Sequence, residues 1–145
     1  MGRVFFDTRT NIQDLTADHT VIPSDSGSTF IVLPAATTLL TLPTPTLAGD
    51  GWNIKVILQS DSGFGGDTIM DQKVNIDMSS LVNVGNIFGS DGDTGVAAVN
   101  TMDFITCSAA ASPGDTFTFL SDGTRYFVNG FVFDASECVF ADATA

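Results

Sequence analysis

Residues 110–134, AASPGDTFTFLSDGTRYFVNGFVFD, contain the pattern that decides the fold of this chain. Thr116 and Thr118 alternate there with Phe117 and Phe119. This period of two places hydroxyl groups on one face of a strand and aromatic rings on the other. The stretch therefore predicts antiparallel β-sheet.

Turn residues divide the same stretch into consecutive strands. Residues 121–124 are predicted to form a turn, because their glycine adopts positive φ readily and their aspartate can bond its own backbone. The return strand is expected over residues 125–128. Asn129–Gly130 is predicted to be the next turn, and residues 131–133 the strand that follows it.

Short apolar or alternating runs, separated by clusters of Gly, Pro, Asp and Ser, recur through the chain. They predict further strands over residues 29–33, 37–42, 52–59, 74–78, 102–107 and 137–140. No segment combines helical periodicity with helix caps over three turns or more. About eight to ten short strands at this spacing predict an all-β fold, a single antiparallel β-sandwich of jelly-roll type with little or no helix.

The first twenty residues differ from the remainder in composition. They have no clean periodicity, and they include the adjacent rings of Phe5 and Phe6 together with two of the basic residues, Arg3 and Arg9. We expect residues 1–20 to form an N-terminal arm or an edge strand, and residues 21–145 to form the β-sandwich domain.

Charge and composition exclude several classes of function. The formal net charge is −12, and charged residues make up only 15% of the chain, against roughly 25% on average. Nucleic acids and anionic membranes are therefore not expected as partners, since both require clustered basic residues. The chain contains no apolar run long enough to span a membrane and no secretory leader pattern, so synthesis in a cytoplasm is expected.

Reactive side chains are few. His19 is the only histidine, and no nucleophile elbow accompanies it, so catalysis by His19 with Asp18 is not expected. Asp91 and Asp93 could supply oxygen ligands that are close together in the sequence. The other ligand positions of an EF-hand loop, however, are not acidic here. A surface turn is the favoured interpretation there, and a weak calcium site is the alternative.

Three further residues have a structural and a functional interpretation. Cys107 and Cys138 are expected as buried reduced thiols, with a disulfide as the alternative. With one histidine and no C-x-x-C motif, neither a metal site nor a cofactor is predicted. Trp52 shares a strand face with apolar residues, so it is predicted to belong to the core rather than to a sugar-binding platform.

Three groups of motifs resemble the β-structured capsid decoration (cement) and fibre-type virion proteins of tailed bacteriophages. They are residues 26–30 with 40–43, residues 49–56, and residues 114–117 with 121–130. The closing hairpin departs from the family, because Tyr126 and Phe127 stand where such proteins commonly have tryptophan.

The resemblance implies a structural virion protein, with no enzymatic activity, on the outer surface of the capsid. It implies a homotrimer that binds the major capsid protein and stabilises the assembled head. A tail-fibre tip or a receptor- or carbohydrate-binding β module is the alternative. As a hypothesis from composition, Arg3, Phe5, Phe6 and Arg9 would anchor an N-terminal arm to the shell.

Overall fold

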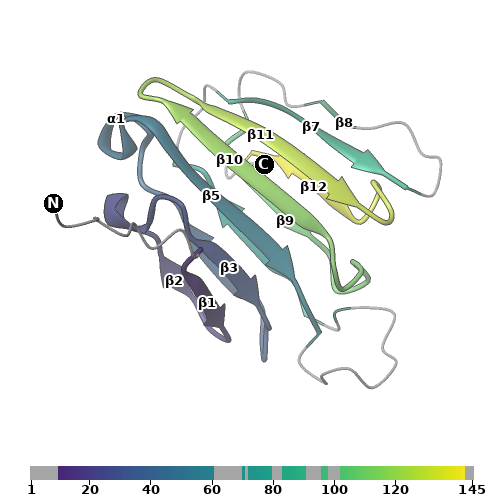
Figure 1. The fold of residues 1–145 in the computed structure, drawn as a ribbon. Helices are drawn as coiled ribbons and strands as arrows, with labels where there is room; N and C mark the ends of the chain where they lie inside the picture. Colours follow the sequence, from purple (N-terminus) through teal and green to yellow (C-terminus); the bar gives the residue numbers. More distant parts are fainter. Residues whose placement is uncertain are drawn as a thin grey trace, which may run out of the picture.

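The computed structural model describes residues 10–60, 70, 72–79, 83–90, 96–97 and 102–142. These residues form mainly strands, together with a short helix α1 (Pro45–Ala48) and a 3-10 turn η1 (Pro23–Asp25). The predicted all-β class is confirmed (Figure 1). No helix within the described ranges is long and apolar enough to cross a membrane.

The strands form two sheets. The first sheet has seven strands, in the order β1 (Ile12–Leu15), β3 (Thr29–Val32), β5 (Asp50–Leu58), β10 (Thr116–Asp122), β11 (Tyr126–Val132), β7 (Val84–Gly89) and β8 (Val96–Ala97). The second sheet has five strands, in the order β12 (Cys138–Ala141), β9 (Phe104–Cys107), β6 (Val74–Asp77), β4 (Thr38–Thr41) and β2 (His19–Thr20).

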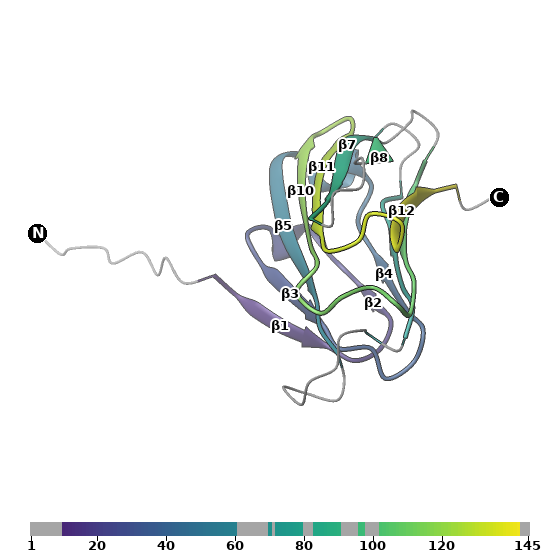
Figure 2. The same cartoon turned by 90° about the vertical axis from the view of Figure 1, so that its right-hand side faces the viewer.

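Figure 2 shows the two sheets as two layers. Their inner faces share one hydrophobic core, in which Phe30 and Phe117 of the first sheet and Leu40 and Ile76 of the second are fully buried. Alternation along each strand explains this arrangement, because every second side chain points to the same face. The predicted alternation of Thr116–Phe119 is confirmed, since both phenylalanines face inward.

The N-terminal half winds between the sheets. Strands β1, β3 and β5 lie in the first sheet, while β2, β4 and β6 lie in the second, so the chain changes sheet after each strand. Whenever the chain re-enters a sheet, the new strand runs in the same direction as the previous strand of that sheet. Neighbouring strands in this half are therefore parallel. The prediction of antiparallel pairing throughout is therefore wrong for this half, and also for β11 with β7.

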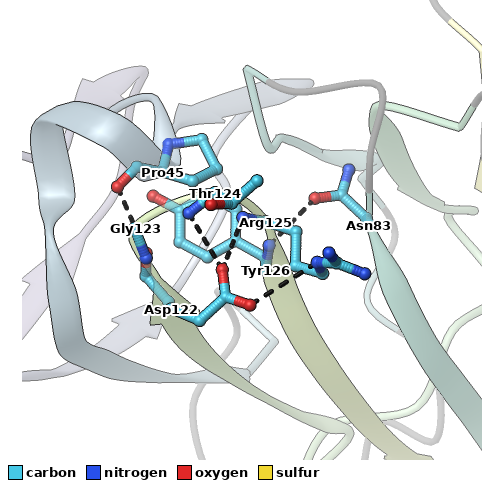
Figure 3. A network of polar contacts seen from close by, with 8 residues as sticks. Pro45, Asn83, Asp122, Gly123, Thr124, Arg125 and Tyr126 are labelled. Atoms are coloured by element: carbon cyan, nitrogen blue, oxygen red, sulfur yellow. Dashed lines mark hydrogen bonds and ion pairs between the residues drawn. The ribbon is translucent and has the colours of Figure 1, made fainter.

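The strands β10 and β11 form the antiparallel hairpin that the sequence predicts. In the turn, Oδ1 of Asp122 accepts hydrogen bonds from the backbone N–H groups of Thr124 (2.9 Å) and Arg125 (2.8 Å). The Asp122 carboxylate also forms an ion pair with Arg125 (Figure 3). These backbone hydrogen bonds lower the pKa of Asp122. The turn over residues 121–124 is thus confirmed.

The second predicted turn, Asn129–Gly130, is wrong. Strand β11 continues through both residues, and Gly130 pairs with Phe117 on one side and Ile87 on the other. A Cβ atom at Gly130 would lie 2.9 Å from side-chain atoms of both neighbours. The glycine is therefore needed for close packing of the inner face. In the sequence, a glycine required by packing cannot be distinguished from a glycine required by a turn.

Two aromatic residues join the sheets to the loops that connect them. Trp52 is 3% exposed, which confirms its predicted place in the core, and its Nε1 donates to the Pro23 carbonyl at 3.1 Å. Its ring lies 5.7 Å from the ring of Tyr126. The Tyr126 hydroxyl donates to the Pro43 carbonyl at 2.5 Å, and burial raises the pKa of Tyr126.

Replacement of Gly85 tests how closely β7 and β11 approach. A Cβ atom there would lie 2.3 Å from the Val128 carbonyl oxygen, which belongs to the backbone and cannot rotate away. We expect Gly85→Ala to lower the free energy of unfolding by about 1–3 kcal/mol. Urea titration measures this change, and Asn86→Ala on the exposed face should alter it by less than about 0.5 kcal/mol. Equal effects of both variants would contradict this packing.

Candidate functional site

The outward face of the seven-stranded sheet contains three parallel rows of side chains. The middle row, called the polar row, crosses five strands in continuous register and consists of Thr29, Lys55, Thr118, Asn129 and Asn86. Since neighbouring strands lie about 4.8 Å apart, the row is about 19 Å long. It provides hydroxyl, amide and amine groups along one straight line.

Apolar side chains flank the polar row on both sides. On one side the apolar row consists of Val84, Phe127 and Leu120, which are paired across β7, β11 and β10. On the other side lies the phenylalanine patch, defined as Phe88, Phe131 and Phe133. Phe88 and Phe131 are directly paired across β7 and β11.

The phenylalanine patch is unusually exposed for such large apolar side chains. Phe88, Phe131 and Phe133 are 51%, 65% and 60% exposed. They point outward because their neighbours Ile87 and Val132 occupy the core. Contiguous exposed apolar side chains of this size mark interaction surfaces in soluble proteins.

A buried carboxylate holds one end of the phenylalanine patch. Oδ1 of Asp115 accepts a hydrogen bond from the Phe133 N–H at 2.8 Å, and Oδ2 accepts one from the Ser112 N–H at 3.1 Å. Asp115 also lines a cavity of about 220 Å³ beside Phe131. Burial raises the pKa of Asp115, and the two backbone hydrogen bonds oppose that shift.

A groove of about 370 Å³ lies over β3, β5, β10 and β11. Residues of the polar row and the apolar row line it, among them Lys55, Asn129, Leu120 and Phe127. Among its described lining residues, Lys55 is the single charged one. The groove thus offers hydrogen-bonding groups beside an apolar wall.

The two cysteines lie opposite each other across β9 and β12. Cys107 and Cys138 are paired in register, and both are buried and free. The prediction of buried thiols is therefore confirmed. Burial raises the pKa of Cys107 well above its ordinary value, with further contributions from Cys138 and Asp115. Cys107 accordingly serves as a packing group, since only a thiolate is a strong nucleophile.

His19 does not form a catalytic arrangement with its acidic neighbour. The His19 ring packs against the ring of Phe30, at a centroid distance of 5.6 Å. Oδ1 of Asp18 instead accepts a hydrogen bond from the Leu39 N–H at 2.8 Å. His19 Nε2 is buried and has no hydrogen-bond partner in the described part of the chain.

Other predicted positions lie outside the described residues. These are the proposed anchors Arg3, Phe5, Phe6 and Arg9, and the alternative calcium ligands Asp91 and Asp93. Over the ranges that the structure does describe, no three His, Cys, Asp or Glu side chains lie together in a way that could hold a metal ion.

The outward face of the seven-stranded sheet was not identified from the sequence as a candidate site. The signal for the phenylalanine patch was present, because Phe131 and Phe133 alternate with Val132. A turn assigned at residues 129–130 separated this alternation from the strand before it. The groove has no local signal, because its residues come from β3, β5 and the β10–β11 hairpin, which are far apart in the chain.

Replacing Asp115 with Asn tests how this carboxylate is held. A carboxyl whose pKa is higher in the folded chain than in the unfolded chain binds its proton more tightly when folded. As pH falls from 7 towards 4, the wild type should therefore gain free energy of unfolding relative to Asp115→Asn, which has no titratable group there. Urea titrations at several pH values measure this difference. A difference that shrinks on acidification would contradict the raised pKa.

This chain matches no protein-family model, no curated protein and no solved structure.

Proposed function

We propose that this chain is a structural protein that makes and breaks no covalent bond and acts by docking. The observation that carries the proposal is the phenylalanine patch. Burying one exposed phenylalanine side chain contributes about 1.5–3 kcal/mol. Three such side chains on one rigid sheet therefore favour association with another protein surface.

The charge of the chain agrees with docking on a selected partner. At a net charge of −12, copies in free solution repel one another at long range. Short-range apolar contact must overcome this repulsion, so association depends on a close fit at the patch. A charged protein with such a patch discriminates between partners better than an uncharged one. Charge repulsion prevents association wherever the apolar fit is imperfect.

The resemblance in the sequence supplies the proposed biological role. We propose a decoration (cement) protein of a tailed bacteriophage, located on the outer surface of the capsid. It would form a homotrimer, bind the major capsid protein, and stabilise the assembled head by mass action. The proposed architecture is a β-sandwich, with the two sheets as its layers.

The groove over β3, β5, β10 and β11 favours a second candidate function. It combines amide and hydroxyl groups with the apolar side chains of Leu120 and Phe127. Ligand sites commonly place a few polar groups in an apolar setting of this kind. A receptor- or carbohydrate-binding β module, as in a tail fibre, is therefore the alternative.

Replacement of Phe131 with Ser tests the docking surface. We expect the wild type to sediment as a trimer, at three times the chain mass of 15.2 kDa, and Phe131→Ser to sediment as a monomer. Leu47→Ser is a matched control, because Leu47 on α1 is also 65% exposed but lies away from the patch. Analytical ultracentrifugation measures the mass. A wild-type monomer, or a trimer in Phe131→Ser, would refute self-association through the patch.

Removal of residues 1–10 tests the proposed arm separately. Because Arg3, Phe5, Phe6 and Arg9 are proposed to contact the shell, the truncated chain should no longer label expanded phage heads in electron micrographs. Its circular dichroism spectrum should remain that of the full chain. Undiminished labelling would remove these four residues from the proposal.

A further inference from the structure

The groove over β3, β5, β10 and β11 differs in charge from the chain as a whole. The chain has 17 acidic residues and five basic ones. Nevertheless, Lys55 is the single charged side chain among the described residues that line the groove, and no described acid lines it. The local charge is therefore positive on a strongly acidic protein, which favours a ligand carrying a few negative charges.

Two polar side chains in the groove are available for a ligand. The Lys55 ammonium and the Asn129 side-chain amide form no hydrogen bond or ion pair with any other described residue. Thr118 lies between them in the polar row, paired with Asn129 in β11 and with Lys55 in β5. The positions of these groups are set by the sheet, so binding needs little reorganisation of the backbone.

The strands under the groove leave side chains, rather than backbone groups, for a ligand to bind. Each of β3, β5, β10 and β11 lies inside the sheet with a strand on both sides. A peptide could not extend the sheet at this place, because strand addition requires an open edge. Hydroxyl groups of a saccharide, by contrast, bond directly to amide, hydroxyl and ammonium side chains. The net charge of −12 also opposes the many phosphates of a nucleic acid.

We propose that this groove binds a short acidic oligosaccharide that carries carboxylate groups. Lys55 pairs with one carboxylate, and the Asn129 amide binds neighbouring hydroxyl groups. Leu120 and Phe127 contact the apolar C–H face of a sugar ring. This inference rests on the second candidate function, carbohydrate binding, and it uses residues distinct from the phenylalanine patch.

Calorimetry with the full chain tests the assignment. The probes are hexasaccharides of galacturonate, mannuronate and hyaluronan, with methyl-esterified oligogalacturonate and maltohexaose as uncharged counterparts. We expect at least one acidic probe to bind, and its methyl ester to bind roughly tenfold more weakly or worse. Affinity for the acidic probe should also fall as salt concentration rises.

Matched variants locate the site. Lys55→Met keeps most of the aliphatic stem and should reduce affinity roughly ten- to hundredfold, since hydrogen bonds to charged groups are the stronger ones. Lys73→Met changes net charge equally at an exposed position before β6 of the other sheet, and should change affinity less than about twofold. Circular dichroism confirms that both variants are folded.

Each remaining outcome decides against part of the proposal. Binding of maltohexaose or of the methyl ester as tight as that of the acids, weakened by Asn129→Ala, would leave a carbohydrate module but overturn the acidic ligand. Binding of hexaglutamate as tight as that of the acidic saccharides would overturn the saccharide. No binding by any probe would overturn both this inference and the second candidate function. The trimer measurement on Phe131→Ser would still test the docking function independently.

Discussion

The register between β10 and β11 determines which surface this protein presents. Because Phe117, Phe119 and Val128 fill the core, the residues between them must face outward. A shift of one residue would expose the core rings and bury the polar row, at a cost that no local interaction could offset. Gly130 allows this register, since a larger residue would collide with the Phe117 ring. The groove and the phenylalanine patch therefore follow from how the core is packed.

The loops are tied to the same core. The Tyr126 hydroxyl and the Trp52 indole donate to carbonyl groups of Pro43 and Pro23, which lie in connections between the sheets. Prolines end strands, because they lack an N–H group, but their carbonyl groups remain strong acceptors. The polar atoms of these two buried aromatic residues are thus hydrogen-bonded, while their rings fill core volume.

Much of the fold could be predicted from local patterns. The all-β class, the strand that begins near Trp52, the turn over residues 121–124 and the buried cysteines all follow from alternation and turn chemistry. The parallel winding could not be predicted, because a strand has the same period of two whether its neighbour is parallel or antiparallel. The turn predicted at Asn129–Gly130 is wrong because close packing and turns both select glycine. The groove joins Thr29, Lys55, Thr118 and Asn129 through pairings that only the folded chain contains.

The winding of β1 to β6 has a consequence for how the chain can change length. Both sheets end on strands from the first winding, with β1 at one edge of the first sheet and β2 at one edge of the second. An inserted segment of strand, crossover and strand would lengthen both layers together and would leave the pairings of β5, β10 and β11 intact. Like repeat proteins, in which each unit touches only its neighbours, this half of the molecule is suited to growth by duplication.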